Sequence, residues 1–446
     1  MRVLASLGLA LSLAALLAAQ EATGPRELAG LVQASRLSRT VDRLASFGTR
    51  HTLSDQLSDR RGIGAARRWL GGEMQALTRL PDSRLVAFED PFHAEPGPLL
   101  PGGADLVNLG VLLPGTDPGR AREALVLAAH YDSRARNAMD AEADAPGADD
   151  NASGVAVVLE MAAVLAATRP AVSVYFVATA GGAQGSLGSA RLVRRLKGEG
   201  TEVIGMAAVE SVGNVLGPDG SKNGGAMRLF SDGVPAQESE GQRKVRELLG
   251  TENDGAGREL ARYLKRAGDR YVEGLDCLVM LRRDRLGREG EQAPFNRLGY
   301  PGVRVTELVD PYERMNLAKA PGPGKHYGDT PTYFDAGYCA RIARMLVAGF
   351  RQLSFAPAAP QNVGLGGCGT SDARLWWTLP EDPRIAGIVL YRRRADGVQW
   401  QQTRGFVKSE SQVIPGVGTD SDVFAVATVD AQGNESLPVS PRSIEF

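Results

Sequence analysis

Residues 124–160, "ALVLAAHYDSRARNAMDAEADAPGADDNASGVAVVLE", decide the fold. The apolar run at 124–129 ends at His130, which is typical of a short strand buried on both faces. A polar loop follows, and then Asp149 and Asp150 precede an apolar stretch with the length of a helix. We expect Asp150 or Asn151 to be the N-cap of that helix.

The same alternation continues downstream. "VSVYFVATA" at 172–180 and "VIGMAAVES" at 203–211 indicate further buried strands, and "GSARLVRRLKGEG" at 188–200 indicates a helix between them. Strands that alternate with helices predict an α/β fold, with a mostly parallel central sheet and helices on both faces. Ligands of such folds bind beyond the carboxyl ends of the strands, where His130 and Glu210 lie.

The ends of the chain predict two further parts. Residues 1–20 have Arg2, an apolar run and small residues, the pattern of a signal peptide, so we expect a secreted or periplasmic protein. After a proline-containing linker near 355–362, where we expect proteases to cut, short alternating segments predict an all-β sandwich at 360–446. The α/β domain should then span 25–355.

The β-sandwich pattern resembles a fibronectin type III domain, with Trp376 or Trp377 and Tyr391 as core aromatics. A net charge of −1 gives no overall field that would attract nucleic acid, and no segment after the signal peptide is long and apolar enough to span a membrane. Cys277, Cys339 and Cys368 lack the close spacing of a zinc or redox motif. They either include one disulfide or are buried small side chains.

His130 and Asp132 are two residues apart, so in extended backbone their side chains share a face. Asp132 can then hold one ring nitrogen of His130 and leave the other free for a metal ion. The two oxygens of Asp150 suit a carboxylate that bridges two ions. The alternative is that Asp149 and Asp150 only cap the helix.

"HYDS" at 130–133 and "PGADDNASGVA" at 146–156 together resemble the zinc-dependent aminopeptidase family that also contains glutaminyl cyclase, metallopeptidase family 28 in clan MH. "ASFGTRHT" at 45–52 and "YGDTPTYFD" at 327–335 match its texture, and the resemblance covers roughly residues 30–350. It implies a fold of the zinc exopeptidase type, one or two zinc ions, and peptide or peptide-like ligands whose N-terminal residues are removed.

The resemblance also implies roles for single residues. His130 would bind one zinc ion, and Asp132 would orient it. Asp150 would bridge both ions, through a peptide to Asn151 that is cis in many relatives. Glu210 falls where relatives place an aspartate ligand on the zinc ion that the histidine binds.

The second half of that site departs from the family pattern. Relatives carry two consecutive glutamates, a general base and a zinc ligand, where this chain has Gly182 and Ala183, so the position of the general base is vacant. His326 either supplies the last zinc histidine or is a surface residue. Glu307, at the end of "VRVTE", is a candidate substrate contact or a substitute metal ligand, with a packing or salt-bridge role as the alternative.

These residues favour an exported relative with a degraded site, which holds one zinc ion or fewer per chain and hydrolyses poorly. The alternative is an active metallopeptidase, with an altered metal site, that releases N-terminal residues. A serine hydrolase is excluded because the G-x-S-x-G pattern is absent. Restoring the pair, as Gly182→Glu with Ala183→Glu, should supply both the base and the ligand.

Overall fold

The protein is described here by a computed structural model, which places residues 24–312, 314–315, 328–405 and 408–445. The predicted signal peptide and His326 lie outside the described residues. Among the residues that the structure does place, no helix is long and apolar enough to cross a membrane. Cys277 and Cys339 are buried and Cys368 is exposed, and all three are free thiols.

The centre of the molecule is an eight-stranded mixed sheet with the order β1-β2-β4-β3-β5-β8-β6-β7. Its middle strands β4, β3, β5 and β8 run parallel, while β1, β2 and the pair β6–β8 introduce antiparallel neighbours. The strands are β1 (Val86–Ala94), β2 (Ala104–Leu113), β3 (Glu123–His130), β4 (Ser173–Thr179), β5 (Glu202–Val209), β6 (Ala226–Ser231), β7 (Asp276–Met280) and β8 (Gly302–Glu307).

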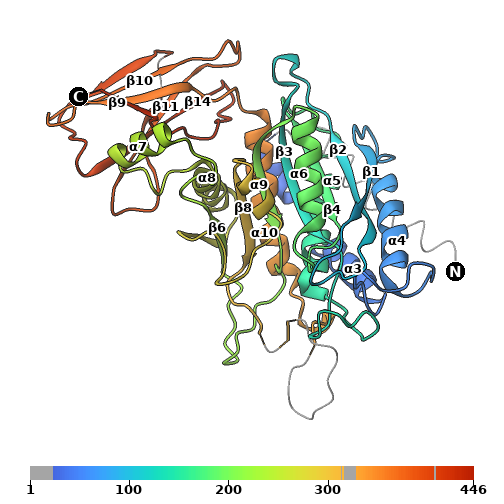
Figure 1. Ribbon diagram of the computed structural model, residues 1–446. Helices are drawn as coiled ribbons and strands as arrows, with labels where there is room; N and C mark the ends of the chain where they lie inside the picture. Colours follow the sequence, from blue (N-terminus) through green and yellow to red (C-terminus); the bar gives the residue numbers. More distant parts are fainter. Residues whose placement is uncertain (1–23, 313, 316–327, 406–407, 446) are drawn as a thin grey trace.

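Helices cover both faces of this sheet, as the continuous apolar strands predict (Figure 1). Along β3, Leu125 and Leu127 belong to the larger core with α5 and α10, whereas Val126 and Ala128 pack with α6 and α9 on the other face. The helices are α2 (Pro25–Gly30), α3 (Ala34–Ala45), α4 (Gly62–Leu77), α5 (Gly154–Leu165), α6 (Leu187–Gly198), α7 (Glu240–Leu249), α8 (Ala256–Tyr271), α9 (Ala293–Arg297) and α10 (Ala336–Phe355).

The helix after the acidic pair begins later than expected. Residues 148–153 form a π-turn, the peptide between Asp150 and Asn151 is cis, and α5 starts at Gly154. Asn151 still acts on the helix start, because its Oδ1 accepts a hydrogen bond from the backbone N–H of Gly154 at 3.1 Å. The turn leaves the Asp150 side chain at the end of β3, beside His130.

The C-terminal part forms two smaller sheets, β13-β10-β9-β15 and β12-β11-β14. Trp377 and Tyr391 are buried in this part, as the alternation predicts, and Trp376 is half-buried. The strands are β9 (Gln361–Gly366), β10 (Ala373–Thr378), β11 (Gly387–Arg394), β12 (Gln401–Gly405), β13 (Ser411–Ile414), β14 (Asp422–Val429) and β15 (Ser443–Ile444).

These sheets lie against α7 and α8 (Figure 1), and buried charges join them to the α/β part. Arg393 of β11 donates to Asp254, just before α8, and the indole of Trp400 donates to Glu259 within α8. Arg262 completes the cluster by pairing with both carboxylates. The C-terminal sheets are therefore docked on the α/β part through its helix α8.

Candidate active site

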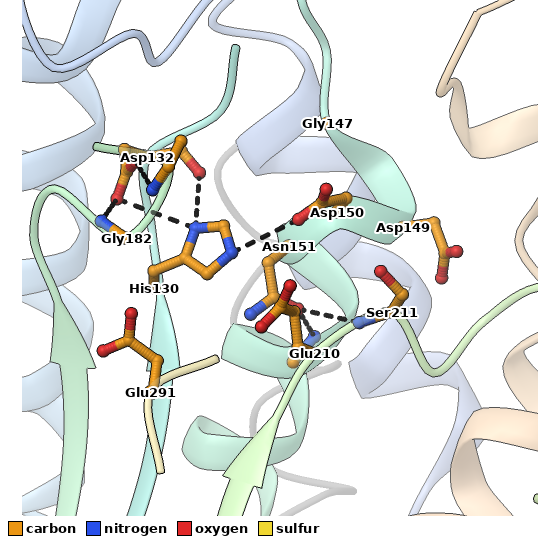
Figure 2. Close-up of polar contacts among 12 residues, drawn as sticks. His130, Asp132, Gly147, Asp149, Asp150, Asn151, Gly182, Glu210, Ser211 and Glu291 are labelled. Atoms are coloured by element: carbon orange, nitrogen blue, oxygen red, sulfur yellow. Dashed lines mark hydrogen bonds and ion pairs between the residues drawn. The ribbon is translucent and has the colours of Figure 1, made fainter. Parts of the chain in front are cut away.

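His130 ends β3 and is almost fully buried. Its Nε2 lies 3.2 Å from Oδ1 of Asp150, and its Nδ1 lies 3.0 Å from the main-chain oxygen of Asp132 (Figure 2). Burial alone would lower the pKa of His130, but the carboxylates of Asp132 and Asp150 raise it well above its usual range. The ring is therefore held at both nitrogens, with Nε2 directed at the acidic pair.

Asp132 holds the ring differently from the sequence prediction. The carboxylate oxygen nearest to Nδ1 is 3.6 Å away, so the main-chain oxygen makes the hydrogen bond. The carboxylate instead accepts the backbone N–H groups of Gly182 and Ala183, at 2.8 and 2.9 Å. Asp132 thus ties the His130 segment to the loop where relatives carry their glutamate pair.

Asp150 is negatively charged in this setting. Burial opposes its ionisation, but the hydrogen bond and charge of His130, with the charges of Arg285 and Arg304, lower its pKa to about 2. Asp329 accepts hydrogen bonds from the backbone N–H groups of Asp149 and Asp150, at 2.6 and 2.8 Å. The acidic turn is therefore fixed by a carboxylate from the "YGDT" segment.

Ligand atoms of His130, Asp150 and Glu210 lie within 4.8 Å of one another. The fold therefore brings together three donors that the sequence had identified. Metal binding by these three residues stays a prediction. A second ion does not fit the described residues, because Ala183 has no ligand atom and the remaining candidate, His326, lies outside them. The described residues therefore offer too few ligands for two zinc ions.

Glu210 is not a free ligand. Its two oxygens each lie 2.7 Å from a terminal nitrogen of Arg304, and Arg285 approaches one of them at 3.4 Å. The side chain of Arg304 is completely buried. A divalent ion at Glu210 would lie next to two guanidinium charges, which would repel it. The three donor side chains thus converge, but the positive charges beside Glu210 oppose a metal ion.

Gly182 leaves no room for a side chain in this conformation. A Cβ added there would lie 2.3 Å from Cβ and Cγ of His130 and 2.9 Å from Oε1 of Glu291. Gly182→Glu therefore does not fit this loop conformation, and the gain of a base by the double variant stays a prediction. The loop would have to move away from Asp132 first, breaking the two hydrogen bonds to its carboxylate.

Glu291 is a buried carboxyl group to which the sequence assigned no role in the site. It accepts a hydrogen bond from the Thr179 hydroxyl at 2.7 Å, and burial raises its pKa to about 7. In Figure 2 its carboxyl group lies on the opposite side of the His130 ring from Asp150. A Cβ at Gly182 would lie 2.9 Å from its Oε1, so the Glu291 carboxyl group occupies space next to the position where the family resemblance expects the base.

Glu307 is corrected as a substrate contact. It is fully buried, and its Oε2 accepts the backbone N–H of Asn214 at 2.7 Å. Burial and the neighbouring Asp149 raise its pKa well above the usual range. Glu307 therefore supports the loop that carries Asn214, in agreement with the packing role that we named as the alternative.

Arg50, from the quoted "ASFGTRHT", is a further residue that the sequence did not assign to the site. It is fully buried and donates to main-chain oxygens of Leu44, Tyr131, Pro146 and Gly147. It thereby joins both ends of the loop from His130 to Asp150. The sequence offered only the resemblance of "ASFGTRHT" to the family. That resemblance does not reveal that Arg50 contacts Pro146 and Gly147, far along the chain.

The fold is of the zinc exopeptidase type, with possible donors gathered at the carboxyl ends of parallel strands. Residues 108–338 match the model of peptidase family M28, and the chain belongs to this family. It is 32% identical over 411 residues to a probable zinc metalloprotease of Leptosphaeria maculans, and the match covers 92% of this chain and 95% of that protein.

A second probable zinc metalloprotease, from Phaeosphaeria nodorum, is also 32% identical, over 439 residues that cover 93% of this chain and 87% of that protein. Among solved structures, the LapA aminopeptidase of Legionella pneumophila superposes with a TM-score of 0.52 at 16% identity and covers 74% of each chain. This similarity confirms the α/β fold. The names of the relatives imply zinc as their metal.

Proposed function

We propose that this chain is an exported member of the family that no longer hydrolyses peptides efficiently. One observation supports this most directly. The two positions of the glutamate pair are Gly182 and Ala183, and their N–H groups serve only to hold Asp132. Neither position carries a group that can accept a proton, and general-base catalysis contributes about 10²- to 10⁴-fold in rate.

Peptides remain the expected ligands, because the family's substrates are peptides and because Asp150 stays ionised beside His130. A carboxylate at that position suits the ammonium group of a peptide N-terminus. The zinc content expected is one ion or fewer per chain, since Asp150 is the single described residue left for the second ion.

The proposal is tested by turnover. Purified protein is incubated with zinc and chromogenic aminoacyl substrates, beside His130→Ala as the variant without its metal histidine. We expect the two proteins to be equally inactive. Robust turnover by the wild type that His130→Ala abolishes would overturn the proposal and establish the second candidate, an active peptidase with an altered metal site.

The second candidate has one observation in its favour, the convergence of His130, Asp150 and Glu210 within 4.8 Å. Three protein ligands are the number that a catalytic zinc site uses. The charge around Glu210 decides whether this convergence is a metal site at all.

A further inference from the structure

Glu210 and Arg304 form a complete ion pair at the centre of the family's metal site. Glu210 follows β5, and Arg304 lies on the neighbouring strand β8, where the register pairs it with Ala208. The two terminal nitrogens of Arg304 each meet a different oxygen of Glu210 at 2.7 Å. The first contact, from Nη1 to Oε2, is a hydrogen bond, and the second, from Nη2 to Oε1, is a close ion pair without hydrogen-bond geometry.

A second guanidinium and its partners surround this pair. Arg285 lies 3.4 Å from Glu210, and it donates to Asp310 at 2.8 Å. Asp310 also accepts from Arg228 at 2.8 Å. Asp284 lies 3.5 Å from Arg285 and 3.7 Å from Arg304, so three carboxylates face these three guanidiniums, with Arg304 as the direct counter-ion of Glu210.

The backbone is also shaped for the pair. A Cβ at Gly290 would lie 2.6 Å from Nη1 of Arg304 and 3.0 Å from Oε2 of Glu210. A side chain there would push into the contact between the two groups. The absence of a side chain at position 290 thus leaves the space in which Arg304 reaches the carboxylate.

We infer that the guanidinium of Arg304, together with Arg285, takes the place of a zinc ion at Glu210, so that this cleft is held together without metal. A zinc ion there would share Glu210 with Arg304 and would lie next to two positive charges. The inference goes beyond the proposed function, which allows one ion per chain.

The first test is calorimetric titration of zinc into wild-type protein, His130→Ala, Arg304→Met and Arg228→Met. Arg228→Met is the matched control, because it removes a half-buried guanidinium of the same network that does not contact Glu210. We expect no zinc site that depends on His130 in the wild type or in Arg228→Met. In Arg304→Met we expect such a site, with an affinity at least about tenfold above the detection limit of the wild-type titration.

The inference is overturned if wild-type protein binds one zinc ion per chain through His130, or if folded Arg304→Met binds zinc no better than wild type. A second measurement tests the inference even if Arg304→Met does not fold. Thermal unfolding of wild type and Glu210→Gln is compared in zinc and in chelator. We expect Glu210→Gln to lower the melting temperature equally in both, because it breaks the ion pair.

A melting temperature of the wild type that rises in zinc, with the rise lost in Glu210→Gln, would show that Glu210 binds the metal and would overturn the inference. This result would not decide the proposed loss of peptide hydrolysis. A chain that binds zinc at His130 and still fails to turn over peptides contradicts the guanidinium account and leaves the loss of hydrolysis standing.

Discussion

Gly182 shows how a single missing side chain changes the site. Its backbone N–H is bound to Asp132, and the position of its absent Cβ is directed at the ring of His130. The loop has therefore settled in a conformation that only a residue without a side chain can adopt. Loss of the glutamate pair is built into the backbone here, so a simple reversion does not restore the relatives' geometry.

We accordingly expect Gly182→Ala to destabilise the protein by about 1–3 kcal/mol, the usual cost of forcing extra atoms into a packed region. Gly198→Ala is the control, because a Cβ at Gly198 meets nothing within 4 Å. It should change the free energy of unfolding by less than about 1 kcal/mol. Urea unfolding measures both, and equal stability of the two variants would contradict the geometry given for Gly182.

Glu291 gives a prediction with a defined pH range. Burial raises its pKa from 4.5 to about 7, so the folded state favours the neutral carboxyl group. Its contribution to stability is fully present below pH 4.5 and is lost as the pH rises through 7.

Glu291→Gln keeps an uncharged group of the same shape, so it should be the more stable protein above pH 7, by at most about 3 kcal/mol. The two proteins should converge near pH 4.5. Denaturant unfolding across this range checks the sign, and a variant that is less stable than wild type at pH 8 would contradict it.

At the scale of elements, the loop between β3 and α5 is held by an arginine that belongs to neither. Arg50 donates to Tyr131 just after β3, and to Pro146 and Gly147 just before the acidic turn. Burial lowers the pKa of Arg50 to about 10, against the raising effect of nearby aspartates. His130 and Asp150 are thus held 3.2 Å apart by contacts outside both of their elements.

Removing this arginine should be costly. Arg50→Met leaves several buried carbonyl oxygens without a donor, and each costs about 1–3 kcal/mol. We expect the variant to lose more than about 3 kcal/mol of stability in denaturant unfolding. Arg61→Met, which removes an exposed ion pair with Asp144 of the same loop, should lose less than about 1 kcal/mol. Similar losses in both variants would refute the role of Arg50.

The sequence predicted those parts of the site that depend on local pattern. His130 and Glu210 each follow a buried strand, and parallel strands bring their ends to one edge, so the convergence with Asp150 was predictable. The partners of Glu210 were not, because they depend on β8 lying beside β5 and on its register. From side-chain alternation we predicted that the carboxylate of Asp132 would bond the ring of His130. It instead accepts the N–H groups of Gly182 and Ala183, and alternation along one strand says nothing of such a distant loop.

At the scale of the whole molecule, the connection between the two parts is better protected than its sequence suggests. Ala356 is buried, and its oxygen accepts from Arg120 and Arg384. Ala358 donates to Asp382 and accepts from Thr428. Proline and alanine are typical of an exposed linker, but these tertiary contacts make residues 356–360 part of the docked interface, so early cleavage there is no longer expected.

We expect limited proteolysis of wild-type protein to leave residues 356–360 intact until other sites are cut. Arg393→Met removes the buried partner of Asp254 at the interface, so it should expose this connection and speed cleavage there. Arg394→Met is the control on the next residue, because that side chain is exposed and pairs with exposed Asp396. Masses of the fragments identify the cut, and early cleavage in all three proteins would contradict the docked arrangement.

We infer that protein charges, and not zinc, fill the His130–Asp150–Glu210 site of this family member. Native mass spectrometry of the full chain, after incubation with zinc and removal of excess ion, tests it most directly. We expect the mass of the metal-free chain for wild type and for His130→Ala alike. One or two zinc ions retained by the wild type and absent from His130→Ala would contradict it.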